Sequence, residues 1–192
     1  MVAPTVWMGL AEHHVAFGGS FTVSLSTWHA LLRELCQAIL RAGFKRIVIV
    51  NGHGGNMSAL NALTVELTRA LDAPIATTNY FLFLEDAMDG ILEDQVGVQH
   101  ACEAETSMML ALRPELVDTA RLPEAVGPQA SMAAALARRL HVWKSFRGLS
   151  SSGVLGDARR ATSEKGERLL DAAAEGLAKA LLAGEPWGAD QV

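Results

Sequence analysis

The chain has 192 residues, a length typical of one domain; 50% of them are hydrophobic and 19% are charged. This composition excludes an intrinsically disordered chain, because such chains combine low hydrophobicity with high net charge. The net charge of −5 gives no electrostatic reason to expect binding to nucleic acid or to an anionic membrane surface.

Signals for membrane insertion or export are also missing from the sequence. No apolar run approaches the ~18 residues of a transmembrane helix, and residues 1–7 lack the basic and apolar regions of a signal peptide. We therefore expect a single cytoplasmic domain over residues 1–192, in which the two cysteines, Cys36 and Cys102, are reduced.

The first segments of the chain predict one short strand and one long helix. Residues 5–8 form a short apolar run that could be a buried strand. The segment 27–42 repeats apolar side chains at helical spacing, with Ser26 or Thr27 available as the N-cap and Gly43 as the stop. Cys36 lies on this apolar stripe, which predicts a place in the core rather than in the chemistry.

Two further strands, joined by a helix, follow. Residues 46–51 are an unbroken β-branched run, which favours a strand in the middle of a parallel sheet. A helix is predicted at 56–71, and 75–80 is the next strand. The order β-α-β-α-β predicts an α/β fold, with right-handed crossovers and helices on both faces of a parallel sheet.

The second half of the chain has a less regular pattern. Residues 81–100 predict a long loop with a short helix, 101–112 a helix, and 129–141 a weak helix. The last helix has the clearest signal, with Ser163 as its N-cap. Its buried stripe should consist of Leu169, Leu170, Ala173, Leu177, Ala180 and Leu181.

The most informative motif is Asn51-Gly52-His53-Gly54-Gly55-Asn56, between the central strand and a helix. Ligands of open parallel sheets bind outside the carboxyl ends of the strands, so His53 stands where a functional side chain would be placed. Two other interpretations are open. The turn could cradle a phosphate with its backbone amides, although its spacing fits no known nucleotide motif. It could also be a plain tight turn with an incidental histidine.

A second motif, His100-Ala101-Cys102-Glu103-Ala104-Glu105-Thr106-Ser107, opens the predicted helix at 101–112. Carboxylates in a first helical turn commonly face solvent as partners of the helix dipole, and on that interpretation Glu103 and Glu105 need no function. The functional interpretation is a metal-binding carboxylate with His100 as a general acid–base group. Cys102 is expected to be a buried thiol.

A third histidine-rich segment covers residues 9–20 and contains Glu12, His13 and His14. Adjacent histidines point in different directions on most backbones. We therefore expect that His13 and His14 do not bind one ion. His29 and His141 have no partners nearby in the sequence and are interpreted as structural or surface residues.

These motifs resemble the creatininase family of metal-dependent amidohydrolases. The Asn51 to Asn56 and His100 to Ser107 motifs carry the resemblance. Residues 9–20 are similar to the family's G-x-x-x-x-H-x-x-F-P-G-T stretch, with Gly18 and Ser20 in place of Pro and Thr. Further support comes from residues 153–157 and 161–167, which are similar to the family's lead-in to its final helix.

The resemblance implies a three-layer αβα sandwich with a mostly parallel central sheet. It also implies hydrolysis of a non-peptide or cyclic amide C–N bond in a small molecule, by water activated on two divalent ions, Zn²⁺ or Mn²⁺. Family members form homo-oligomers, which implies a hexamer. Carried over to this sequence, His53 and Glu105 are metal ligands and His100 transfers protons. Substrate binding is assigned to His14, Gly54 and Gly55.

The sequence departs from the family before residue 5. The family has a first strand ending in Glu-x-His, followed by an Asp that bridges the metals, so the chain is expected to be truncated at its N-terminus. His53 and Glu105 alone would hold metal weakly, because a catalytic zinc normally has three protein ligands. Glu12, His13 or His14 could stand in for the missing ligands, although nothing in the sequence requires it. Three hypotheses follow: an amidohydrolase whose sequence starts at an internal Met, a non-catalytic paralogue that binds a small molecule, and a phosphate-binding α/β module.

Overall fold

A computed structural model describes residues 1–93, 97–129, 139–140 and 142–188, and the chain divides into two compact units, Met1–Tyr80 and Phe81–Val192. The expectation of one domain over residues 1–192 stays a prediction. Among the described residues, no helix has both the length and the apolar character needed to cross a membrane. The predicted segment 129–141 lies almost entirely outside the described residues.

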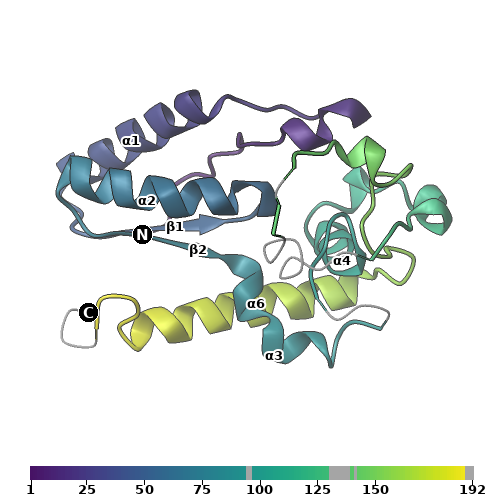
Figure 1. Cartoon of the computed structure of the whole chain (residues 1–192). Helices are drawn as coiled ribbons and strands as arrows, with labels where there is room; N and C mark the ends of the chain where they lie inside the picture. Colours follow the sequence, from purple (N-terminus) through teal and green to yellow (C-terminus); the bar gives the residue numbers. More distant parts are fainter. Residues whose placement is uncertain (94–96, 130–138, 141, 189–192) are drawn as a thin grey trace. The chain divides into compact units, whose positions relative to one another are not determined.

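The first unit is built on two parallel strands, each preceded by a helix. Strand β1 pairs with β2 from Ile47 opposite Ile75 to Asn51 opposite Asn79, and α1 and α2 lie on the same side of the pair (Figure 1). The sequence prediction of these four elements is confirmed. Their bounds are α1 Leu25–Arg41, β1 Ile47–Asn51, α2 Met57–Leu71 and β2 Ile75–Asn79.

The core of this unit forms where the apolar faces of both helices meet the strands. Cys36 is buried in it, as predicted, and burial raises the pKa of its thiol. Because each buried leucine or isoleucine contributes roughly 1.5–3 kcal/mol, this cluster fixes the position of the strand ends. The buried members are Trp28, Leu32, Cys36, Ile47, Leu60, Leu63, Leu67 and Ile75.

Two local predictions for this unit are wrong. Residues 5–8 form no strand, and Trp7 is instead 70% exposed, with its ring edge-to-face against Phe21 at 5.9 Å. A strand needs backbone partners, and β1 pairs only with β2 in the described part of the chain. The N-cap of α1 is Ser24, whose Oγ accepts the backbone N–H of Thr27 at 3.2 Å, so the helix begins earlier than predicted.

The second unit contains three described α-helices, α3 Glu85–Met88, α4 Glu103–Leu112 and α6 Ser163–Leu182. The predicted long loop with a short helix at 81–100 corresponds to the 3₁₀ turn Tyr80–Phe83 followed by α3. The N-cap of α6 is Thr162, not Ser163, because the Thr162 side chain accepts the backbone N–H of Lys165. Leu169 is fully buried as predicted, whereas Leu181, in the last turn, is 36% exposed.

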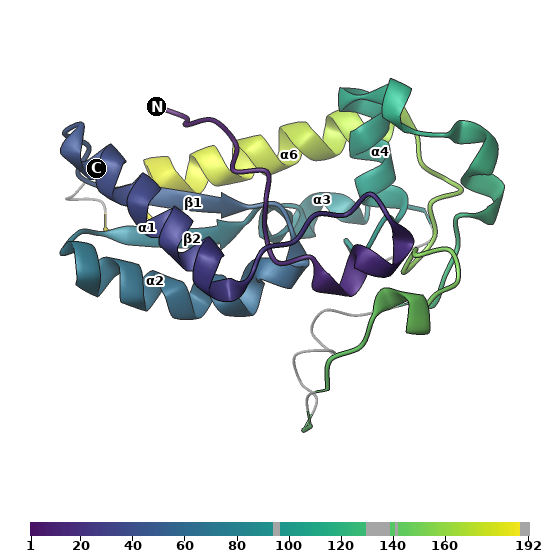
Figure 2. The same ribbon diagram turned by 90° about the horizontal axis from the view of Figure 1, so that it is seen from above.

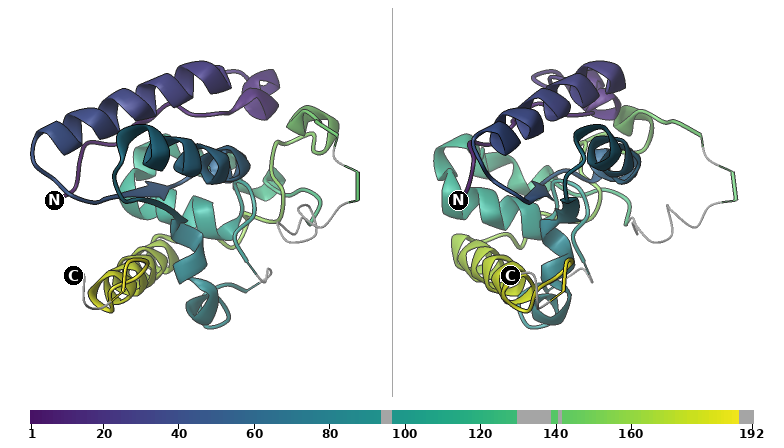
Figure 3. Two further views of the ribbon diagram at one scale, coloured as in Figure 1. Left: turned by 60° about the vertical axis from the view of Figure 1, so that its left-hand side comes forward. Right: turned by 90° about the vertical axis from the view of Figure 1, so that its left-hand side faces the viewer.

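Helices α4 and α6 pack closely against each other (Figure 2, Figure 3). A Cβ atom on Gly166 would collide with the backbone carbonyl of Ser107, so only glycine permits this approach. The Ser107 hydroxyl also accepts the backbone N–H of Thr162 at 3.1 Å. The contact therefore fixes the first turns of both helices relative to each other.

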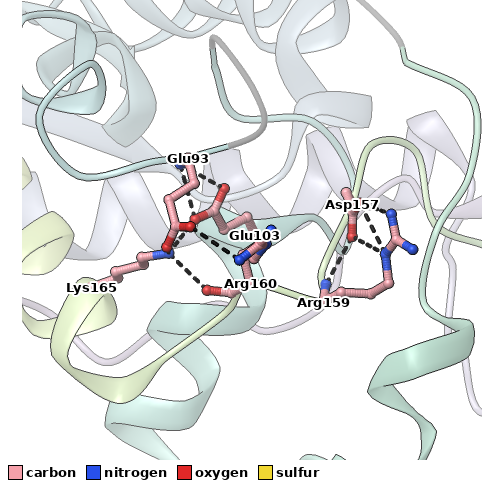
Figure 4. A network of polar contacts seen from close by, with 6 residues as sticks. All are labelled: Glu93, Glu103, Asp157, Arg159, Arg160 and Lys165. Atoms are coloured by element: carbon pink, nitrogen blue, oxygen red, sulfur yellow. Dashed lines mark hydrogen bonds and ion pairs between the residues drawn. The ribbon is translucent and has the colours of Figure 1, made fainter.

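A buried ionic network joins the start of α4 to α6 (Figure 4). The side chain of Glu103 is fully buried, which corrects the expectation of a solvent-facing carboxylate. Its oxygens accept the backbone N–H of Glu93 at 3.2 and 3.1 Å and the Nζ of Lys165 at 2.6 Å. Lys165 also donates to the carbonyl of Arg160 at 2.8 Å. The network satisfies the carboxylate and holds the helix that carries Glu105.

Candidate metal centre

The turn after β1 is held by a group of asparagine side chains. Asn51 Nδ2 donates to Asn79 Oδ1 at 2.7 Å and to the carbonyl of His53 at 2.8 Å. Asn51 Oδ1 accepts the backbone N–H of His53 at 3.2 Å and Asn56 Nδ2 at 3.1 Å. Because Asn51 and Asn79 end the two paired strands, this group fixes His53 at the carboxyl edge of the sheet.

The same group fixes the N-terminal segment against the turn. Asn56 Oδ1 accepts the backbone N–H of Leu10 at 2.9 Å, a contact between residues 46 positions apart. A Cβ atom on Gly9 would lie 2.9 Å from both polar atoms of the Asn56 amide, so glycine is needed for this approach. The 3₁₀ helix η1, Glu12–Phe17, follows directly and carries two histidines.

The side chains of His13, His14 and His53 converge into what we call the three-histidine cluster. The ring centroids lie 4.0 Å apart for His13 and His14, and 5.3 Å from each of these to His53. One potential ligand atom from each histidine lies within 4.8 Å of the other two. The expectation that His13 and His14 diverge is wrong, because a 3₁₀ helix separates consecutive side chains by about 120° rather than the 180° of a strand.

Gly55 lets the ring nitrogen of His53 lie close to the backbone of the turn. A Cβ atom at position 55 would collide with His53 Nε2 and would lie 2.5 Å from His13 Cε1. His53 Nε2 is buried and has no hydrogen-bond partner among the described residues. A buried polar atom without a partner is uncommon and indicates a missing ligand or water. The nitrogen therefore fits the role of a metal ligand.

The protonation of the cluster also fits metal binding. Burial lowers the pKa of His53, and hydrogen bonding to the backbone of Leu10 acts in the opposite direction. Burial also lowers the pKa of His13, and a positive charge on His53 lowers it further. Both imidazoles are thus neutral at neutral pH, which is the form that binds metal ions.

The second unit contains a histidine–carboxylate pair at the start of α4. His100 Nδ1 lies 3.8 Å from Glu105 Oε2, which accepts the backbone N–H of Ala101 at 2.6 Å. Two backbone hydrogen bonds with Leu155 hold His100, and its ring packs edge-to-face on Phe146 at 4.9 Å. Burial raises the pKa of Glu105 to about 6, against the effect of the Ala101 hydrogen bond. In the absence of metal, Glu105 can therefore take up or release a proton close to neutral pH.

The predicted site residues fall into two groups, one in each compact unit. His53, His14 and Gly55 come together in the first unit, where Gly54 begins the short 3₁₀ helix Gly54–Asn56. His100 and Glu105 come together in the second unit. The sequence offered no reason to join His13 to the site, and sequence reasoning assigned no role to the side chains of Asn51, Asn56 and Asn79. Asn51 and Asn79 end the two strands, and this strand-end position could have indicated that they hold the turn.

Comparison with known proteins identifies relatives over nearly the whole chain. The family model of creatinine amidohydrolase, Creatininase, matches residues 1–181. A mycofactocin precursor peptide peptidase of Mycobacterium ulcerans is 31% identical over 171 residues, which cover 88% of this chain and 61% of that protein. A creatinine amidohydrolase of Pseudomonas putida is 27% identical over 202 residues, which cover 94% of this chain and 74% of that protein. The chain thus spans about three fifths of the length of the first of these relatives.

Solved structures show the same relationship. A Bacteroides fragilis protein described as a creatinine amidohydrolase superposes with a TM-score of 0.79 at 26% identity, over 95% of this chain and 71% of that one. A manganese form of creatininase superposes with a TM-score of 0.66 at 25% identity, over 88% of this chain and 68% of that one. A Zn–Zn form of a creatininase variant is also similar. The likeness confirms the α/β class with a parallel sheet and is consistent with a three-layer sandwich.

Proposed function

Because the chain belongs to the creatininase family, we propose that it is a metal-dependent hydrolase that cleaves a non-peptide or cyclic amide C–N bond in a small molecule. The observation that best supports this proposal is the three-histidine cluster, in which burial favours the neutral forms of His13 and His53. The metal would be Zn²⁺ or Mn²⁺, the ions named for the solved creatininases. Assembly into a hexamer and a cytoplasmic location stay predictions.

The predicted residues have three roles in this proposal: metal binding, substrate binding and proton transfer. A bound divalent ion would polarise the amide oxygen and lower the pKa of water. His53 and Glu105 are proposed as metal ligands, and His14, Gly54 and Gly55 as substrate contacts. His100 would deliver a proton to the leaving nitrogen, because its backbone and ring are held in place and a carboxylate lies 3.8 Å from its Nδ1.

The relatives suggest two kinds of substrate to compare. One relative is named for creatinine, a cyclic amide, and the other for a precursor peptide. We favour a small cyclic amide and expect metal-loaded protein to release product from creatinine or a related lactam faster than from a peptide. Chromatography of the products separates these outcomes. Cleavage of peptides alone would contradict the proposed substrate class but not the proposed hydrolase.

Two substitutions test the residue roles. His53→Ala should abolish hydrolysis, because it removes a proposed metal ligand, whereas His29→Gln in α1 provides a matched control with an intact cluster. His100→Asn should lower the rate by about 10²–10⁴-fold while metal content stays unchanged. Normal turnover in folded His53→Ala protein would refute the proposal. Loss of metal from His100→Asn would show that His100 is a ligand.

The alternatives to catalysis have less support. A phosphate site at Gly52 to Gly55 would need positive charge nearby, but burial favours the neutral forms of His13 and His53. Such a module predicts a bound anion and no metal, and elemental analysis distinguishes it. A non-catalytic paralogue predicts tight binding of a small molecule without turnover. Product release that depends on metal excludes both alternatives.

A further inference from the structure

The three-histidine cluster offers more metal ligands than the family resemblance assigns to it. Of these three histidines, the resemblance makes only His53 a metal ligand and assigns His14 to substrate binding. The rings of His13 and His14 nevertheless each lie 5.3 Å from the ring of His53, so both are placed to act as ligands beside it. We propose that His13, His14 and His53 together bind one Zn²⁺ ion as a self-contained site in the unit Met1–Tyr80. This inference goes beyond the proposed function, because it concerns metal retention and holds whether or not an amide is hydrolysed.

The number and type of ligands favour zinc. Three histidine nitrogens with an open fourth position for water are one of the known coordination shells of catalytic zinc. Manganese prefers carboxylate and carbonyl oxygens, and this cluster consists of imidazoles alone. We therefore expect Zn²⁺ to bind and Mn²⁺ to bind poorly.

The dimensions of the cluster allow this site with small ring movements. Tetrahedral zinc, bound at about 2.0–2.1 Å, separates two imidazole nitrogens by about 3.3 Å. The potential ligand atoms lie within 4.8 Å of one another, so rotation of the rings must close the difference. Glycine at position 55 lets the rings of His53 and His13 lie this close together, because a Cβ atom there would collide with His53 Nε2 and lie 2.5 Å from His13 Cε1.

The backbone that carries the three histidines is fixed before any ion binds. Asn51 hydrogen-bonds both the backbone N–H and the carbonyl of His53, and Asn56 hydrogen-bonds the N–H of Leu10, close to η1. Gly9 allows the approach of the N-terminal segment to Asn56. Ligands on a preformed backbone lose less conformational entropy on binding, which favours tight binding.

Zinc titration of the metal-free chain, with a chromophoric chelator as competitor, tests the site. We expect one Zn²⁺ per chain. His13→Ala, His14→Ala and His53→Ala should each weaken binding about 100-fold or more, because each removes one of three direct ligands. His29→Gln, which leaves the three-histidine cluster intact, should bind zinc like the parent chain. Circular dichroism of every variant verifies that it is folded.

Nitrogen-15 NMR of the unmodified chain gives a test that needs no variant. Of its six histidines, three should show imidazole shifts with stoichiometric Zn²⁺, and none with the same amount of Mg²⁺. Zinc retained by folded His13→Ala protein, zinc lost from folded His29→Gln, or Mn²⁺ bound as tightly as Zn²⁺ would each overturn the proposal. So would fewer than three shifted imidazoles.

Discussion

Replacing Lys165 by Met should destabilise the second unit far more than removal of an ordinary surface charge. The Nζ of Lys165 lies 2.6 Å from the carboxylate of Glu103, whose side chain is fully buried. Burial lowers the pKa of Lys165, but hydrogen bonds to Glu103 and Glu93, together with their charges, raise it overall. Met keeps much of the length of the side chain, so the substitution removes mainly the charge and its hydrogen bonds.

The expected loss follows from the charge that is left behind. Breaking a buried ion pair by removing one partner typically costs about 3–5 kcal/mol, because the remaining ion is desolvated without compensation. Glu103 would keep its contacts with the backbone N–H of Glu93, but that N–H carries no full positive charge to balance the buried carboxylate. We therefore expect Lys165→Met to lower the free energy of unfolding by about 3 kcal/mol or more.

Urea unfolding at pH 7 measures this loss as a shift in the transition midpoint at constant slope. Arg121→Met is the matched control, because the ion pair between Arg121 and Glu124 is about three-quarters exposed on both sides and should contribute nothing measurable. Adding Glu103→Leu to Lys165→Met should recover part of the stability, because no buried charge then remains. Equal losses for Lys165→Met and Arg121→Met would refute this reasoning.

Three further changes test other contacts. Gly55→Ala should weaken zinc binding in the competition titration, because the added Cβ collides with His53 Nε2; unchanged affinity would contradict this. In metal-free protein, the raised pKa of Glu105 means that its protonated form stabilises the fold. This effect is complete below pH 4.5 and is lost as the pH rises through about 6. The free energy of unfolding should therefore fall by up to about 2 kcal/mol over this pH range in the parent chain, and not in Glu105→Gln. Gly166→Ala should cost about 1–3 kcal/mol in urea unfolding, because its Cβ meets the Ser107 carbonyl.

The elements that sequence predicted well are those whose signal is local. Helix α1 and strand β1 each have an apolar pattern of their own. Residues on these apolar positions, Cys36 among them, are buried in the core. Residues 5–8 have a similarly apolar composition, but a strand also needs a neighbouring backbone, and none pairs with this segment among the described residues. Composition alone therefore could not decide that case.

The burial of Glu103 shows a second limit of local patterns. A glutamate in a first helical turn normally faces solvent. Lys165, 62 positions further along the chain, donates a charged hydrogen bond to Glu103 and so helps to make its burial tolerable. The sequence pattern at 163–182 predicted the helix that carries this lysine, but it did not predict that the lysine pairs with Glu103. Charge pairing between distant elements depends on how those elements pack, and a local sequence pattern carries no information about that.

The histidines show why the candidate metal centre was only half predicted. His53 was found because a strand end followed by glycines is a strong local signal. His13 and His14 were not expected to bind one ion, because adjacent side chains point in different directions on most backbones. Their convergence depends on η1, and η1 reaches the turn because Asn56 binds the backbone of Leu10, 46 positions earlier. Gly9 and Gly55 permit these two close approaches, since a Cβ at either position would clash. Glycines and asparagines that look like turn residues in the sequence are therefore the residues that assemble the ligands.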